Sequence, residues 1–133
     1  MKKYIIASIL VFLADTCHSN EWIPIGQQPN LEETGVLEVK LWKLLKSKGK
    51  TKFEAKESYR FQYQYISKSV VFINAICLPF PKPNSDPGVF PGPTTEILKK
   101  EIYEVMDGGS CFFNVEYNIE SGTFTSLSVN GEA

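Results

Sequence analysis

The side chains best suited to chemistry in this chain are one histidine, His18, and three cysteines, Cys17, Cys77 and Cys111. Histidine is the usual general base and metal ligand near neutral pH, and a cysteine thiolate beside it is a common nucleophile. His18 and Cys17 are neighbours near the amino terminus, far in sequence from the other two cysteines. Which of these groups can act together therefore depends on the fate of the amino-terminal segment.

Residues 1–19 have the pattern of a cleavable secretory signal. Two lysines precede an uncharged run over residues 4–14, and small or polar residues follow it. This order is typical of signal peptides, and the run is shorter than the roughly 20 residues that a transmembrane helix needs. We predict bacterial Sec-type export with cleavage after Ser19, so that residues 20–133 form one small domain, without a transmembrane segment, in the periplasm or outside the cell.

Two other interpretations of this segment stay open. A buried helix is one, although such a helix ordinarily shows a polar face and residues 4–14 have none. Lipid modification of Cys17 is the other. Lipoprotein signals usually carry a small residue just before the modified cysteine and a leucine three before it, whereas this chain has Thr16 and Ala14 at those positions.

Cleavage after residue 19 would change the chemistry that the chain can perform. The remaining 114 of the 133 residues contain Cys77 and Cys111 but no histidine. An even cysteine count in an exported protein favours a disulfide, so we predict that these two residues pair, with two buried free thiols as the alternative. Such a bond stabilises a fold by about 3–4 kcal/mol in the chain-entropy description. Catalytic triads with histidine, Cys–His pairs and zinc sites with histidine ligands are excluded.

Carboxylates are the groups left for acid–base chemistry. None of them stands in a recognisable catalytic motif, so we interpret them as solvated surface and expect no catalytic residue, no cofactor and no metal site. The protein is therefore predicted not to be an enzyme. The carboxylates concerned are Glu32, Glu33, Glu101, Glu104, Asp107, Glu116 and Glu120.

The charge of the mature chain is nearly balanced, with twelve Lys and Arg against fourteen Asp and Glu. This balance gives no sign of a nucleic-acid partner. Eight of the twelve basic residues nevertheless lie between Lys40 and Arg60. We interpret this stretch as a solvated helix face followed by a charged turn, with a patch for an anionic lipid, glycan or protein as the alternative.

Hydrophobic periodicity predicts one helix and several strands. Residues 31–48 carry leucines at helical spacing, with Asn30 as the expected N-cap. Alternating or continuous apolar patterns predict strands over residues 59–66, 70–77, 101–106, 111–119 and 123–129, and residues 21–27 are a first strand or an extended arm. A two-residue turn is expected at Ser121 and Gly122. The leucines of the helical stripe are Leu37, Leu41, Leu44 and Leu45.

These elements predict an α+β fold with one N-terminal helix packed on an antiparallel sheet of four to six strands. An all-β sandwich is the alternative if residues 37–45 form a strand. Residues 79–94 contain six prolines, which predicts an irregular surface loop. We interpret Phe80 and Phe90 as a possible interaction site on this loop, with a stiff crossover as the alternative.

Three stretches together resemble small exported bacterial proteins of unknown function. They are YRFQYQY at residues 59–65, FINAIC at 72–77 and DGGSCFF at 107–113, with the ending VNGEA. Those proteins share a Tyr-x-x-Gln-Tyr strand, an Ile-Asn-Ala-x-Cys strand and an Asp-Gly-Gly turn before the last hairpin. The resemblance implies a Cys77–Cys111 pairing and a helix before the first hairpin, and it implies no activity.

The order of elements is also similar to the cystatin or monellin arrangement. Cystatins inhibit cysteine proteases with a Gln-x-Val-x-Gly hairpin, and the corresponding stretch here, residues 62–66, lacks the glycine. We therefore predict an exported, non-enzymatic binding or interaction protein whose partner is a protein or a glycan. A cystatin-like protease inhibitor or another secreted effector is the alternative.

Overall fold

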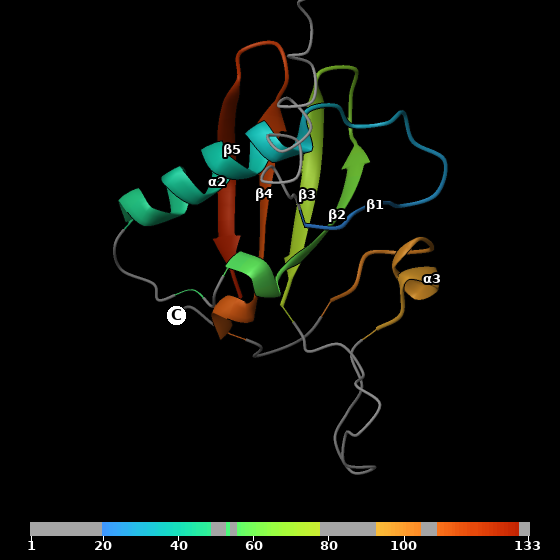
Figure 1. Cartoon of the computed structure of the whole chain (residues 1–133). Coiled ribbons are helices and arrows are strands. Elements are labelled where there is room, and N and C mark those ends of the chain that lie inside the picture. Colours follow the sequence, from blue (N-terminus) through green and yellow to red (C-terminus); the bar gives the residue numbers. More distant parts are fainter. Residues whose placement is uncertain (1–19, 49–52, 54–55, 78–92, 105–108, 131–133) are drawn as a thin grey trace, which may run out of the picture.

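A computed structural model describes residues 20–48, 53, 56–77, 93–104 and 109–130. The predicted signal segment, and most of the Pro-rich loop with Phe80 and Phe90, lie outside these ranges. The described chain is α+β, with one main helix over a five-stranded sheet (Figure 1). Its elements are β1 (Trp22–Pro24), α2 (Thr34–Lys48), η2 (Lys56–Ser58), β2 (Arg60–Tyr65), β3 (Val70–Ile76), α3 (Thr95–Leu98), η3 (Gly109–Cys111), β4 (Phe112–Asn118) and β5 (Thr123–Val129).

The strands lie side by side in chain order, from β1 to β5. Strands β2 to β5 are antiparallel neighbours, but β1 runs parallel to β2, with Trp22 opposite Phe61. The predicted α+β fold with an antiparallel sheet is confirmed, except that this first pair is parallel. The reason is the helix between them, because a crossover through α2 returns the chain to the same end of the sheet. The helix is consequently not the first element, since β1 precedes it.

Helix α2 begins later than its leucine stripe alone suggests. It starts at Thr34 rather than near Leu31, and it ends at Lys48 as predicted. Glu33 adopts a positive φ of 53°, and the backbone NH of Leu37 donates to the Glu33 carbonyl at 3.0 Å. Residue 33 rather than Asn30 thus closes the first turn, because a left-handed residue interrupts a right-handed helix.

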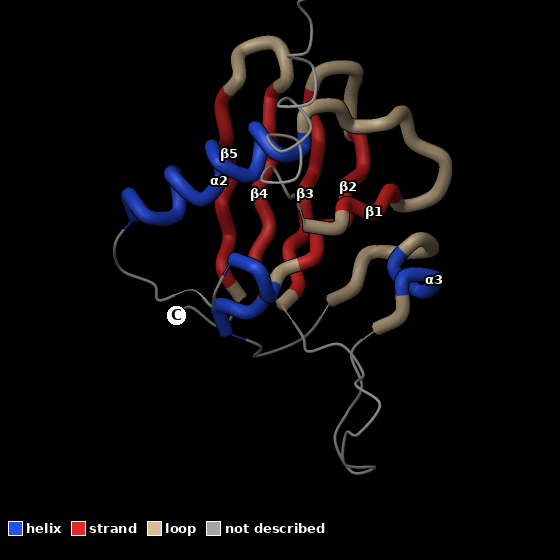
Figure 2. The backbone as a smooth tube through the Cα atoms, in the orientation of Figure 1, coloured by secondary structure: helices blue, strands red, loops and turns tan. Residues whose placement is uncertain are grey.

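The main core fills the space between α2 and one face of the sheet (Figure 2). Leu37, Leu41 and Leu45 are buried on one side of the helix, as the spacing of the apolar residues predicted. The sheet contributes alternate residues from each strand, because successive side chains point to opposite faces. These buried sheet residues are Phe61, Tyr63, Val71, Ile73, Ala75, Phe113 and Val115.

The second face of the sheet is covered in part by α3 and the segment that follows it. Ile23, Ile76, Leu98 and Phe112 form a smaller buried cluster there. The short helix α3 spans Thr95–Leu98. The predicted strand at residues 101–106 is wrong over 101–104, its described part, which is not a strand.

Side chains, rather than a neighbouring strand, supply hydrogen bonds to the backbone of residues 98–103. The Gln62 amide donates to the carbonyls of Leu98 and Glu101, both at 2.8 Å, and its oxygen accepts from the Tyr103 backbone NH at 2.9 Å. Asn74, opposite Gln62 in the sheet, donates to Gln62 at 2.8 Å and to the Tyr103 carbonyl at 3.0 Å. Two amide side chains therefore satisfy a backbone that no strand pairs with.

The last hairpin differs from its prediction in the turn. Residues 119–122 form a four-residue connection, and Asn118 pairs with Thr123. Gly122 has a φ of 70°, and its NH donates to the Asn118 carbonyl at 2.8 Å. The register shifts between Asn114 and Glu116, which places a bulge along β5. Bulges of this kind discourage other chains from pairing with an edge strand.

Candidate functional site

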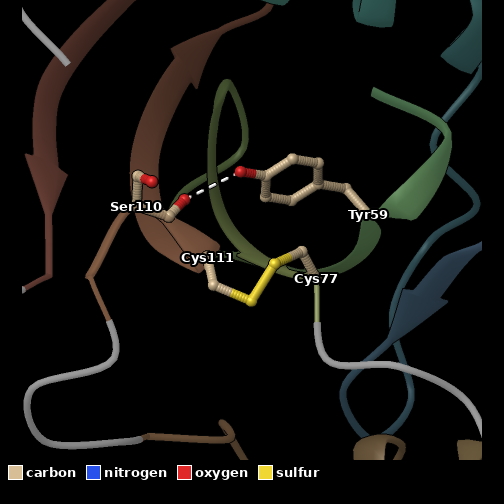
Figure 3. Close-up of a disulfide and its surroundings, with 4 residues drawn as sticks. All are labelled: Tyr59, Cys77, Ser110 and Cys111. Carbon is tan, nitrogen blue, oxygen red and sulfur yellow. Dashed lines mark hydrogen bonds between the residues drawn. A yellow bond between two sulfur atoms is a disulfide. The ribbon is translucent and has the colours of Figure 1, made fainter. Parts of the chain in front are cut away.

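The two predicted disulfide partners meet where β3 ends and β4 begins. Cys77 and Cys111 are joined, with their Cα atoms 4.9 Å apart (Figure 3). The Cys77 NH donates to the Cys111 carbonyl at 3.0 Å, and the Tyr59 hydroxyl donates to the Ser110 carbonyl at 2.8 Å. Bonded sulfurs are not nucleophiles, so this cluster supports the fold and offers no reactive thiol.

The described residues of the stretches YRFQYQY, FINAIC and DGGSCFF lie together in the fold. Tyr59 lies beside the disulfide, and Gln62 and Asn74 form the amide pair under residues 98–103. Each of these side chains is buried and hydrogen-bonded within the protein. Their positions explain the spacing of the motifs by packing rather than by chemistry at an exposed site.

The basic stretch between residues 40 and 60 divides into two environments. Lys40, Lys43, Lys46 and Lys48 are exposed on α2, as a solvated helix face predicts. Arg60 is buried, which the sequence interpretation missed. Burial lowers the pKa of Arg60, and the charge of Glu21 and the hydroxyl of Tyr103 oppose that shift. Because the ordinary pKa of an arginine guanidinium is so high, Arg60 stays charged at neutral pH.

The candidate binding site is a groove between the start of α2 and the β4–β5 turn, called here the helix–hairpin groove. Its volume is about 460 Å³. Apolar and aromatic side chains line part of it, namely Val36, Tyr65, Tyr117 and Ile119. Charged side chains line the rest, namely Glu32, Glu33, Lys40 and Glu120.

Neighbouring rings fix the two tyrosines of the groove. Tyr65 makes an edge contact with Tyr63, with the ring centroids 6.5 Å apart. Tyr117 lies against Phe124 at 4.7 Å. The Lys40 ammonium lies 6.0 Å from the centre of the Tyr117 ring, within the range of a cation–π interaction. The groove therefore already holds one cation against an aromatic face.

Apolar surface and negative charge occur together in this groove. Val36 is 54% exposed and Ile119 is 42% exposed, although both are aliphatic. Three carboxylates face one ammonium, so the groove has an excess of negative charge. Burial raises the pKa of Tyr65, and Tyr63 and Glu32 raise it further, so this hydroxyl remains protonated and can donate at neutral pH.

Sequence reasoning missed the groove because its parts are distant in the chain. Glu32, Glu33 and Glu120 were interpreted as solvated surface, and Tyr65 only as part of a strand over residues 59–66. Only the pairing of β3 with both β2 and β4 brings residue 65 near residue 117. No local pattern in the sequence signals that meeting.

The described residues hold no candidate metal centre. Within these ranges, no three His, Cys, Asp or Glu side chains are grouped as metal ligands. The helices placed by the structure also include none long and apolar enough to cross a bilayer. Comparisons of the chain with protein-family models, with curated proteins and with solved structures found no match.

Proposed function

We propose that this is an exported, non-enzymatic binding protein that holds a basic peptide segment in the helix–hairpin groove. The observation that carries the proposal is the combination of three carboxylates with two tyrosine rings and exposed aliphatic side chains in one concave surface. Aromatic faces and carboxylates both attract lysine and arginine, whose long stems also pack on apolar surface.

The size and shape of the groove suit a peptide. A volume of about 460 Å³ is within the range of roughly 300–1,000 Å³ that is usual for ligand sites. The groove is open to solvent, so a chain can pass across it and insert one or two side chains. Lys40 over Tyr117 shows how such a cation would lie, and Tyr65 offers a second ring.

Export is supported by the signal pattern at residues 1–19 and by the disulfide between Cys77 and Cys111. Disulfides persist in oxidising compartments and are rare in the bacterial cytosol. A domain of this size also has a modest core, for which a covalent link between β3 and β4 is useful.

Fluorescence anisotropy with a short Arg- and Lys-containing peptide tests the binding proposal. We expect the mature protein to bind this peptide and not its Glu-substituted counterpart. Removing two rim charges in a Glu32→Gln, Glu120→Gln variant should weaken binding by about 3- to 10-fold, while the exposed Glu57→Gln control, away from the groove, should not. Equal binding of both peptides, or an equal loss in the control, would contradict the proposal.

The alternative of a cystatin-like inhibitor has less support from the described geometry. Of the stretch at residues 62–66, Gln62 and Tyr63 are buried in β2, and only Ile66 is well exposed at the β2–β3 turn. A wedge for a protease cleft would have to come from that turn. Inhibition of papain by micromolar protein would favour this alternative over the groove.

A further inference from the structure

Glu38 is the one acidic side chain that is buried in the described part of the chain, at 9% exposure. It lies on α2 and faces β1. One carboxylate oxygen, Oε1, accepts two hydrogen bonds, from the Trp22 indole NH at 2.7 Å and from the Asn20 backbone nitrogen at 2.8 Å. The Asn20 side chain in turn donates to the Lys56 carbonyl at 2.7 Å. Asn20 is therefore held on two sides.

A buried carboxylate is costly unless a positive charge or several donors compensate it. The ion pair recorded among the described residues joins Lys99 to Glu96, and Glu38 has no cationic side chain of those residues within ion-pair distance. In the uncleaved chain both of its donors are neutral. Glu21, next to Asn20, is exposed, and its carboxylate accepts instead from the Thr95 hydroxyl at 3.1 Å.

The nitrogen that Glu38 contacts is the one that signal cleavage after Ser19 would release. We infer that Glu38 is the docking site for the α-amino group of the mature chain, an inference that rests on the export proposed above. Hydrolysis of the Ser19–Asn20 bond by a signal peptidase consumes one water. It leaves a carboxylate on Ser19 and an amine on Asn20, which takes up a proton.

Cleavage thus replaces a neutral amide donor to the Glu38 carboxylate with an ammonium donor, so that the hydrogen bond becomes an ion pair. The second charge adds Coulomb attraction to a bond that before cleavage is ionic on the acceptor side alone. The resulting ion pair joins β1, an edge strand of three residues, to the main helix. Removal of the signal segment therefore strengthens the fold at the point where the chain enters the sheet. A chain that begins one residue earlier or later places its charge elsewhere.

The test uses protein made without export, from a removable fusion that leaves Asn20 as the first residue. A matched protein retains Ser19, so that the Asn20 nitrogen stays a neutral amide. We expect the chain beginning at Asn20 to melt about 3–6 °C higher at neutral pH. With the Glu38→Gln substitution, the protein that begins at Asn20 and the protein that begins at Ser19 should melt at the same temperature. With the exposed Glu33→Gln control substitution, the difference between the two proteins should persist.

A second measurement reports on the amine itself. The pKa of the Asn20 α-amino group, measured by NMR, should lie above its ordinary range of about 7.7–8.0 and return to that range in Glu38→Gln. Equal melting temperatures for the two starting points, or a difference that survives in Glu38→Gln, would overturn the inference. Neither outcome bears on export, which is decided separately by the mass of the exported product.

Discussion

At the scale of single residues, the fold depends on a polar side chain with no access to water. Gln62 is 0% exposed and makes four hydrogen bonds to groups on β3 and on residues 98–103. The alternation of residue types along β2 predicted a strand over residues 59–66 that includes Gln62. It could not predict burial, because the segment that covers Gln62 is more than thirty residues away in the chain.

We predict that Gln62→Ala lowers the free energy of unfolding by about 2–4 kcal/mol. The substitution removes the partner of the Leu98 carbonyl, which is buried, and of the Glu101 carbonyl and the Tyr103 NH, whose hydrogen bonds are partly buried. Each group orphaned away from water costs about 1–3 kcal/mol before relaxation. Urea denaturation measures the change. Gln64→Ala, on the same strand and face, is the control and should cost no more than about 0.5 kcal/mol. Similar losses in the two variants would contradict this role for Gln62.

A second prediction at this scale concerns the tyrosine of the groove. The raised pKa of Tyr65 means that the folded protein retains a proton that the unfolded chain loses above pH about 10. The contribution of Tyr65 to stability is therefore complete below that pH and is lost as the pH rises through the folded pKa. Phenolate absorbance should show one late-titrating tyrosine that disappears in Tyr65→Phe. An unchanged titration curve in that variant would contradict the assignment.

At the scale of elements, sequence patterns predicted which segments form helices and strands better than they predicted how those segments pair. The helix and strands β2 to β5 follow from periodicity, because the apolar spacing of each element reflects the core face it covers. The parallel pairing of β1 with β2 was missed, since a three-residue strand carries too little pattern to give its direction. The late start of α2 was missed because nothing in the sequence marks Glu33 as left-handed.

The leucine stripe of α2 provides a test of how the helix is held. Leu41 is 0% exposed, whereas Val39 on the same helix is 67% exposed. We predict that Leu41→Ala lowers the free energy of unfolding by about 2–5 kcal/mol, because it removes buried methyl groups and leaves a cavity. Val39→Ala should change it by less than about 0.5 kcal/mol. Thermal or urea unfolding compares the two variants. A loss of stability in Val39→Ala as large as that in Leu41→Ala would contradict the assignment of Leu41, and not Val39, to the buried face of α2.

At the scale of the whole molecule, one covalent link closes the junction between β3 and β4. The chain between Cys77 and Cys111 includes α3 and the segment that covers Gln62. A link across 34 residues reduces the freedom of the unfolded chain, which matters in a chain of 133 residues. The sequence predicted this pair from cysteine count, but not the amide pair that holds the intervening segment on the sheet.

We predict that the Cys77→Ala, Cys111→Ala double variant loses about 3–4 kcal/mol of unfolding free energy. Treating the unsubstituted protein with a reductant should produce a similar loss, because both changes free the same loop. Denaturation curves recorded with and without reductant compare the two. Stability that does not respond to reductant would show that the sulfurs are not bonded in solution.

Export with cleavage is the claim on which both proposals depend, and intact-mass measurement of the product from the periplasm or medium tests it most directly. The account predicts a chain that begins at Asn20, is two hydrogens lighter than its fully reduced form, and takes up no alkylating group before reduction. A product that still carries His18, or one that is alkylated at two cysteines without reduction, would contradict it.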